Sequence, residues 1–427
     1  MLFVYRIITN LLYPFLFIYL EFRKIKKKED PSKYKQKILS SHFNVKNKGD
    51  AKLIWFHAAS IGEFKSILPI ISQLNINDKR LKFLITTTTL SSGNLAKIEL
   101  EKFDNIEHRF IPYDVNFLIN TFLIQWRPDR IFLVDSEIWP NLILRAKDLK
   151  IPISIINARL TSKSFNKWMV ISNVAKKIFS VFDLCLCSNT ETKEYLKKLS
   201  VKNIYFKGNI KFIGQENEKK ITNINEKFLS EKKFWIASNT HKNEEIVCLK
   251  THMNLKKKFK EVVTIIAPRH IERTNEIMHL SHKLNLNVQI LNKNENIIND
   301  KEIVIINYFG DLLSFYKFSK SVFIGKSMLK KLKNSGGQNP IEAARLNCKI
   351  YHGPYVNNFA EIYEILNKNN ISKKITSSDE LTNNLIDDLE NPSKETKSLS
   401  VKIKEIGHQT LNDTMKLVNN FIYNENK

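Results

Sequence analysis

The stretch Leu53-Ile-Trp-Phe-His-Ala-Ala-Ser-Ile-Gly-Glu-Phe64 is the part of the chain that decides its fold. The first four residues are wholly apolar, as in a strand that is buried on both faces. Small residues, Gly62 and Glu63 follow, and apolar residues then recur at helical spacing from Phe64 onward. The segment therefore predicts a strand, a tight turn and a helix. In an open α/β sheet such a turn lies at the carboxyl end of a strand, where ligands bind.

Glu63 stands at the mouth of this predicted turn. A carboxylate there can accept a proton from a substrate. The alternative is that Glu63 only favours the helix N-terminus through the helix dipole. Taken alone, the segment favours this second interpretation.

Strand-like and helix-like segments alternate through both halves of the chain. With 427 residues, the chain is too long for one ordinary core. The polar residues 214–233 separate the halves and are interpreted as a linker. We predict an α/β protein with two doubly wound, mostly parallel domains, residues 29–213 and 234–427, the second with a helical tail. Two such domains facing each other would form a cleft, the default ligand site. The predicted strands lie near 53–56, 82–86, 109–112, 130–134, 153–157, 184–188 and 204–207, and near 234–237, 262–267, 287–291, 302–306, 321–325 and 349–352.

The composition narrows the class of partner. The formal net charge of +25 favours nucleic acid, anionic lipid or phosphorylated substrates as partners. Helix-turn-helix, zinc-finger and aromatic RNA-binding signatures are absent, so no nucleic acid partner is expected. The four cysteines lack metal-ligand spacing and are interpreted as reduced thiols of a cytosolic protein.

Residues 1–28 form a predicted membrane anchor with a basic flank. The apolar run at 2–20 is interrupted by Arg6 and Pro14 and is followed by the basic residues of 23–28. Aromatic and aliphatic residues next to a Lys/Arg cluster are typical of an anchor or an interfacial helix, with the positive end on the cytoplasmic side. The alternative is a buried amphipathic helix of a soluble protein. No small-residue cleavage site follows, so a cleaved signal peptide is not expected.

Asp135 and Glu137 follow the predicted strand at 130–134. Strand alternation would place both carboxylates on one face, where they could carry out acid–base chemistry or bind a metal. The alternative is helix capping by a solvated acid. No third ligand of suitable type is nearby, so no metal site is predicted. Lys211 follows the last strand of the first half and could neutralise a phosphate, or be merely solvated.

In the second half, Arg269 follows an apolar strand and suits bidentate contact with a phosphate or carboxylate. The alternative is a structural ion pair. The segment 335–342 is glycine-led, and its Asn339, Pro340 and Glu342 fit a capped helix start that can bind an anion. Gly310 and Asp311 begin another predicted helix that could line the site.

Together these stretches resemble one family, the 3-deoxy-D-manno-octulosonic acid (Kdo) transferases of lipopolysaccharide assembly. The order and spacing match over roughly residues 50–365. The matching motifs are HAASIGE (57–63), TTTT…SG (86–93), IPYD (111–114), DSEIWPNL (135–142), NARLT (157–161), GNIKF (208–212), WIASNTHKNEE (235–245), APRHIER (267–273), GDL (310–312), GGQNPIEAA (336–344) and GPYVNNFAEI (353–362).

The resemblance implies a GT-B fold and an inverting glycosyltransferase that needs no cofactor and no metal ion. The implied partners are CMP-Kdo, a tetraacyl lipid A precursor and the cytoplasmic face of the inner membrane. By position, Glu63 is the implied general base, and Asp135 and Lys211 stabilise the transition state, a role that Glu137 could share. The implied CMP-binding residues are Pro268, Arg269, Phe309, Gly310, Asp311, Asn339, Pro340, Ile341 and Glu342.

The chain departs from the family pattern at a few positions. Asp135 and Asp311 each stand where a Glu is usual, Gln338 replaces a His, and Lys326 replaces a glycine. The segment 330–335 is longer than the usual loop.

Two competing hypotheses remain. The first is another two-domain sugar-nucleotide enzyme, either a different glycosyltransferase or an epimerase, although an epimerase would need no anchor. The second is a basic membrane-surface protein without enzymatic activity that binds anionic lipid.

Overall fold

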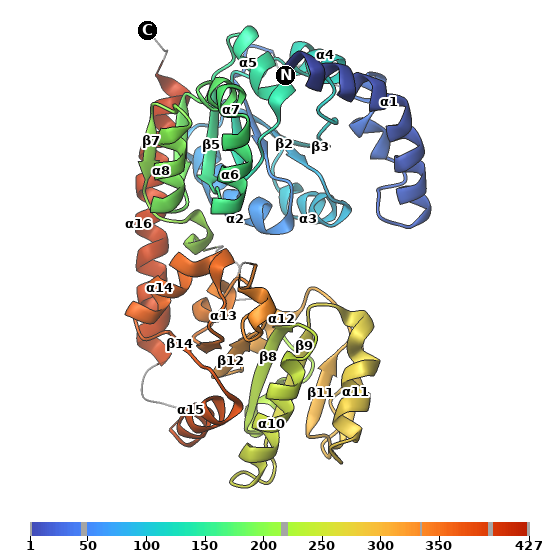
Figure 1. Cartoon of the computed structure of the whole chain (residues 1–427), viewed down its shortest axis with the longest axis vertical. Coiled ribbons are helices and arrows are strands. Elements are labelled where there is room, and N and C mark those ends of the chain that lie inside the picture. The colour runs from blue at the N-terminus through green and yellow to red at the C-terminus, as the bar shows by residue number, and fades with distance from the viewer. Residues whose placement is uncertain (1, 44–48, 215–220, 334, 392–395, 425–427) are drawn as a thin grey trace. The chain divides into compact units, whose positions relative to one another are not determined.

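The computed structural model describes residues 2–43, 49–214, 221–333, 335–391 and 396–424, with the backbone alone at 396–400. The chain forms two compact units (Figure 1). Unit 1 comprises Met1–Gln215 and Ile406–Lys427, and unit 2 comprises Glu216–Glu405.

Unit 1 is built on a seven-stranded sheet in the order β3-β2-β1-β4-β5-β6-β7. All neighbouring strands are parallel. The strand order reverses between β1 and β4, so the turns after these two strands lie at the position where doubly wound sheets bind ligands. The strands are β1 (Leu53–His57), β2 (Lys82–Thr87), β3 (Ile106–Phe110), β4 (Arg130–Val134), β5 (Ile153–Ala158), β6 (Leu184–Cys187) and β7 (Ile204–Phe206).

Helices cover both faces of this sheet, and alternate residues of each strand face the two layers. On β1, Leu53 and Trp55 enter one apolar cluster, whereas Ile54 and Phe56 enter the other. Both faces of β1 are thus buried, as its apolar sequence predicts. The first cluster lies under α4 (Asn116–Trp126), α5 (Pro140–Asp148), α6 (Ser162–Val170), α7 (Ser172–Phe179) and α8 (Thr190–Lys198). The second lies under α2 (Ile61–Asn77), α3 (Leu90–Leu100) and α16 (Thr396–Tyr423).

Unit 2 is a second parallel sheet of seven strands, in the order β10-β11-β9-β8-β12-β13-β14. Its strands are β8 (Phe234–Thr240), β9 (Val263–Pro268), β10 (Val288–Leu291), β11 (Ile303–Ile306), β12 (Ser321–Ile324), β13 (Lys349–His352) and β14 (Ser372–Lys374). Its helices are α9 (Glu226–Glu231), α10 (Glu244–Lys256), α11 (Thr274–His282), α12 (Leu312–Tyr316), α13 (Ile341–Arg345), α14 (Ala360–Lys368) and α15 (Ser378–Glu390). The predicted fold class, two doubly wound parallel domains, is confirmed.

Two elements differ from the sequence prediction. The third strand, predicted at 109–112, is β3 (Ile106–Phe110), since its start is polar and only half-buried. The edge strand β14 was not predicted, because its sequence Ser-Lys-Lys lacks apolar residues. In the structure it pairs with β13.

The C-terminal tail is helical, as predicted, but does not belong wholly to the second domain. From Ile406 onward, α16 clusters with unit 1. Met415, Val418 and Ile422 are buried against the strands and helices of that unit's second apolar cluster. Of the predicted linker, residues 215–220 lie outside the described residues, and α9 forms within the remainder.

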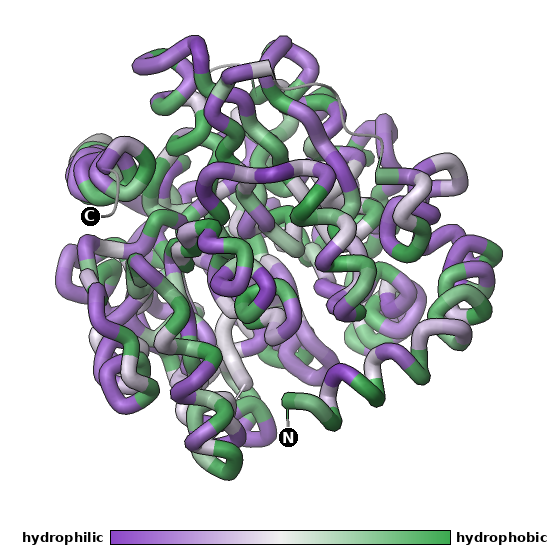
Figure 2. The backbone as a smooth tube through the Cα atoms, turned by 90° about the horizontal axis from the view of Figure 1, so that it is seen from above, coloured by the Kyte–Doolittle hydropathy of each residue, from purple (hydrophilic) through white to green (hydrophobic). Residues whose placement is uncertain are grey.

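The N-terminal segment is one helix, α1 (Leu2–Ile25), which contains Pro14. It is long and apolar enough to cross a membrane. Figure 2 shows green, hydrophobic stretches along this helix, which begins at the label N.

Candidate functional site

The turn after β1 places Glu63 in the first turn of α2. The Ser60 hydroxyl oxygen caps the helix by accepting a bond from the Glu63 amide at 3.3 Å. The Glu63 carboxylate in turn accepts bonds from the Ala59 amide at 2.7 Å and the Ser60 hydroxyl at 2.9 Å. The capping interpretation of Glu63 therefore has a structural counterpart. These two bonds leave acceptor positions on the Glu63 carboxylate open, because a carboxylate can accept further hydrogen bonds.

The environment of Glu63 favours the protonated carboxyl. Burial raises its pKa above the ordinary value, and the negative charges of Asp135 and Glu137 raise it further. The two hydrogen bonds from Ser60 and Ala59 offset this only in part. A carboxylate whose pKa is shifted towards neutrality is a better proton acceptor for an alcohol than an ordinary one.

Asp135 pairs with Lys211, which sequence reasoning treated as a separate candidate. The Lys211 ammonium lies 2.5 Å from Asp135 Oδ2. The Asn157 amide donates to Asp135 Oδ1 at 2.6 Å. Asp135 is buried, and its backbone has φ 56°, a left-handed conformation that Asp tolerates better than most residues. The alternatives, a solvated Lys211 and a helix-capping Asp135, are therefore not seen, because the two side chains pair with each other.

Glu137 belongs to a second polar group beside this pair. Its Oε2 accepts a bond from the Trp139 indole at 2.7 Å and lies 3.4 Å from Nε2 of the buried His57. The other ring nitrogen of His57 lies 2.9 Å from the Thr86 hydroxyl. Burial raises the pKa of Glu137, but its contacts with His57 and Trp139 outweigh burial, so the pKa is lowered.

The prediction that strand alternation places Asp135 and Glu137 on one face is wrong. Strand β4 ends at Val134, so both residues lie in a turn and strand alternation does not apply to them. They are nevertheless both close enough to Glu63 for their charges to raise its pKa. The turn after β4 lies next to the turn after β1 because these strands are neighbours in the sheet.

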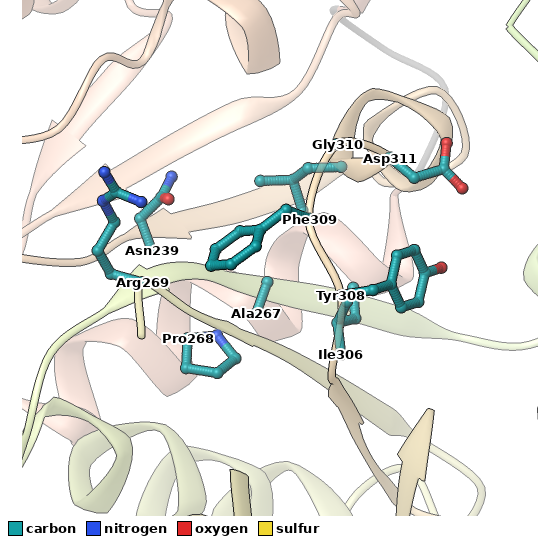
Figure 3. A pocket seen from close by; sticks show the side chains of 10 residues that line it. Asn239, Ala267, Pro268, Arg269, Ile306, Tyr308, Phe309, Gly310 and Asp311 are labelled. Carbon is teal, nitrogen blue, oxygen red and sulfur yellow. The ribbon is translucent and has the colours of Figure 1, made fainter. Parts of the chain in front are cut away.

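In unit 2, a cavity of about 140 Å³ opens at the carboxyl ends of β8, β9 and β11. Five of the predicted nucleotide-binding residues line it: Pro268, Arg269, Phe309, Gly310 and Asp311. Figure 3 shows Arg269 and Asn239 at one side, with the ring of Phe309 directed between them and the segment of Tyr308 and Asp311. Sequence reasoning missed Asn239 and Tyr308, although each lies at or just after a strand's carboxyl end.

Two side chains of this cavity are available for a ligand. Arg269 is exposed, and its guanidinium makes no ion pair within the part of the chain that the structure describes. The ion-pair alternative for Arg269 is therefore not seen. Phe309 is 62% exposed, so its ring is accessible to a ligand in the cavity. Gly310 has φ +101°, a conformation that glycine permits at the turn into α12.

The second predicted nucleotide-binding segment, Asn339 to Glu342, does not line this cavity. Pro340 occupies the N-cap position that the sequence assigned to Asn339, and Asn339 Oδ1 accepts a bond from the Ile341 amide at 3.1 Å. Helix α13 has five residues, and the binding of an anion at its start stays a prediction. The glycine at the start of this segment lies against the backbone, since a Cβ on Gly336 would lie 2.1 Å from the Tyr355 carbonyl oxygen.

Glu244, another residue that sequence reasoning missed, holds the turn after β12. Its buried carboxylate accepts bonds from the amides of Lys326, Ser327 and Met328 at 2.6, 2.7 and 2.9 Å. It also accepts one from the His241 amide at 2.9 Å. A carboxylate with four backbone donors fixes two turns at once. Lys326 therefore stands in a rigid turn, with φ 58°, a left-handed conformation that favours glycine.

The described residues contain no group of three or more His, Cys, Asp or Glu side chains that could hold a metal ion. All four cysteines are buried and unpaired.

Comparisons with known proteins show the family of this chain. A family model described as 3-deoxy-D-manno-octulosonic-acid transferase (kdotransferase) matches residues 33–213. A probable mitochondrial 3-deoxy-D-manno-octulosonic acid transferase of Arabidopsis thaliana is 30% identical over 382 residues, covering 86% of this chain and 83% of the relative. The transferase of Rickettsia bellii is 27% identical over 98% of this chain and 99% of its own. That of Haemophilus influenzae is 28% identical over 73% of each.

Solved structures share the fold across most of the chain. A putative UDP-N-acetylglucosamine 2-epimerase from Listeria monocytogenes has a TM-score of 0.61 at 12% identity, covering 88% of this chain and 98% of its own. A glycosyltransferase from Rickettsia africae has a TM-score of 0.58 at 11% identity, covering 88% and 100%. These likenesses support the GT-B class and say nothing of activity. The sequence relatives show the family: the chain belongs to the 3-deoxy-D-manno-octulosonic acid transferases, a family of glycosyltransferases.

Proposed function

We propose that this chain transfers Kdo from CMP-Kdo to a hydroxyl of a tetraacyl lipid A precursor, with Glu63 as the general base. The observation that carries the proposal is the Glu63 carboxylate itself. It stands at the switch point of the unit 1 sheet with a raised pKa, beside the Lys211–Asp135 ion pair.

The chemistry follows from these groups. Glu63 takes the proton of the acceptor hydroxyl, whose oxygen attacks the anomeric carbon of Kdo from the face opposite the leaving group. CMP departs with the bonding electron pair, and the configuration inverts. The Lys211 ammonium supplies positive charge for the negative charge that develops in the transition state. Asp135 holds Lys211, while Glu137 is held by Trp139 and His57.

The cavity in unit 2 supports the donor assignment. The exposed ring of Phe309 can stack on a cytosine, and Arg269, which forms no ion pair with any described residue, can bind the phosphate of CMP. We assign Pro268, Gly310 and Asp311 to the same nucleotide site. Asn339, Pro340, Ile341 and Glu342 remain candidates for binding another part of the donor.

A lipid acceptor suits the N-terminal region. The apolar helix α1 and its basic flank point to a membrane surface, and we propose the cytoplasmic face of the inner membrane, where lysine-rich flanks are retained. No nucleic acid partner and no cofactor form part of the proposal.

The decisive experiment incubates the purified full-length chain with CMP-Kdo and the tetraacyl acceptor and examines the lipid by mass spectrometry. A product heavier by one or more Kdo residues is expected. Glu63→Gln should lower kcat/KM by roughly 10²–10⁴-fold, because the amide cannot accept the proton.

Glu380→Gln is the matched control. Glu380 occupies the corresponding capping position in α15, where its carboxylate accepts a bond from the Thr376 amide at 2.8 Å and its own amide donates to the Ser377 hydroxyl. If capping alone matters, the two variants will behave alike. Full activity of Glu63→Gln would remove the proposed base, and no Kdo-containing lipid from the native chain would overturn the acceptor assignment.

A further inference from the structure

Helix α1 is attached to unit 1 along one face and at both ends. Near its start, the Tyr5 hydroxyl donates to Asp114 Oδ2 at 2.8 Å. In its middle, the Tyr13 hydroxyl donates to the Ile38 carbonyl oxygen at 2.9 Å, and the Tyr13 ring packs edge-on against Phe117 of α4. Leu20 is fully buried. Near the end, Arg23 pairs with Glu29 at 2.6 Å.

The opposite face of α1 is apolar and open. Val4, Leu11, Ile18 and Ile25 recur every seven residues, which is two helical turns, and are 51%, 68%, 70% and 76% exposed. Phe3, Ile7, Ile8, Phe15 and Phe22 flank this stripe and are exposed as well. We call these nine residues the outer face of α1. Monomeric soluble proteins rarely expose so much continuous apolar surface without a partner.

Positive charge adjoins the outer face at its end. Lys26, Lys27 and Lys28 are exposed immediately after Ile25, and the Lys26 ammonium lies 4.3 Å from the centre of the Phe22 ring. Lysines beside an apolar helix face match the anionic surface of a bilayer. A second copy of this chain is a poor occupant, because it would bring its own lysines to the contact on a protein of net charge +25.

If α1 spanned the membrane, the contacts of its inner face, the face that packs on unit 1 through Tyr5 and Tyr13, would be disrupted. The Asp114 carboxylate that holds Tyr5 also accepts bonds from the amides of Asn141 and Leu142, each at 3.0 Å. This carboxylate and the start of α5 belong to the folded unit and cannot follow the first turn of α1 across the hydrocarbon. If α1 crossed the bilayer, the bonds of Tyr5 and Tyr13 would have to break.

We propose that α1 lies in the plane of an anionic bilayer, with its outer face among the lipid chains and its inner face kept on unit 1. This inference rests on the membrane association proposed above and specifies its geometry. The helix is roughly 36 Å long, so it would present a long apolar edge to one leaflet. It would keep the start of unit 1 at the lipid surface, where a lipid acceptor is found.

The test measures depth at four points of the outer face. Single cysteines at Val4, Leu11, Ile18 and Ile25 carry a fluorophore, and the four native cysteines are buried and stay unlabelled. The full-length chain is bound to vesicles of phosphatidylcholine and phosphatidylglycerol, with quenchers placed at different depths of the acyl chains. We expect four equal, shallow depths.

A spanning helix would instead place Leu11 and Ile18 deep and Val4 and Ile25 at opposite interfaces. That gradient, or the absence of any quenching from lipid, would overturn the proposal. Because the readout is position and not turnover, it stands apart from the transferase assay, which can be run in detergent.

A matched pair of substitutions tests the surface independently. Ile18→Asp should weaken vesicle binding roughly tenfold. Ile98→Asp is the control, since Ile98 lies on α3, in the other helix layer, and is 69% exposed against 70% for Ile18. Equal binding by the two variants would exclude the outer face of α1 as the docking surface.

Discussion

The Lys211 ammonium lies 2.5 Å from Asp135 Oδ2, joining two residues that are 76 positions apart in the chain. Asp135 follows a central strand, whereas Lys211 follows the edge strand β7. The segment after β7 turns back over the sheet, and its Ile210 amide donates to Asn157 Oδ1 at 3.1 Å. Gly208 permits this return, because its φ of +98° is a conformation that favours glycine. A Cβ at this position would also lie only 2.5 Å from the hydroxyl oxygen of Thr410 in α16.

Replacing Lys211 tests this ion pair. Lys211→Met should lower kcat roughly 10²–10³-fold, since the preorganised cation is lost. It should also cost about 3 kcal/mol of stability, because Asp135 stays buried without its partner. Steady-state kinetics and urea unfolding measure the two effects. Lys197→Met, which removes an exposed pair with Glu194, should change stability by less than about 0.5 kcal/mol and leave activity intact. A fully active Lys211→Met would remove Lys211 from the mechanism.

The pH profile tests the charge that acts on Glu63. The free-enzyme kcat/KM should fall on the acid side as Glu63 becomes protonated, and it should do so above the ordinary pKa of a glutamate, since burial and the neighbouring carboxylates raise that pKa. Glu137→Gln removes one of these negative charges. The pKa of Glu63 should then decrease, and the acid limb should move to lower pH. An unmoved limb, or one displaced to higher pH, would show that Glu63 is not the group that titrates.

Phe309 tests the nucleotide cavity. Phe309→Ala should raise KM for the donor roughly tenfold with little change in kcat, because a stacking surface worth about 1–3 kcal/mol is lost. The ring is 62% exposed, so folding should be unaffected. Tyr205→Ala removes a partly exposed aromatic from strand β7 and serves as the control. The assignment fails if KM for the donor is the same in both variants.

The last helix offers an internal comparison of stability. Val418 of α16 is fully buried in the core of unit 1, whereas Val401 of the same helix is 52% exposed. Val418→Ala should destabilise unit 1 by about 2 kcal/mol, and Val401→Ala by much less. Tryptophan fluorescence follows this unfolding, since four of the five tryptophans lie in unit 1. Equal effects would show that α16 contributes no packing to that unit.

Local sequence was sufficient for most of the fold. Buried parallel strands such as Leu53–His57 and Arg130–Val134 are continuous apolar runs, which stand out between polar turns and amphipathic helices. The edge strand Ser372–Lys374 escaped because an edge strand needs little apolar surface. In unit 1, Glu63 lies close to Asp135 and Glu137, because they follow neighbouring parallel strands whose carboxyl ends share one edge.

What local sequence could not determine are relations between distant residues. It showed Lys211 and Asp135 as separate candidates, and their pairing required the chain to turn back after β7. It also left the side of α1 that faces the protein undecided, because all of its faces are largely apolar. Contacts such as the bonds of Tyr5 and Tyr13 and the burial of Leu20 distinguish the face that packs on the protein. The periodicity of apolar residues shows which face of a helix or strand is buried. It does not show which distant residue a side chain contacts, because that depends on loop closure and packing across the whole unit. Tertiary structure alone therefore decided these two contacts, and with them the membership of α16 in unit 1.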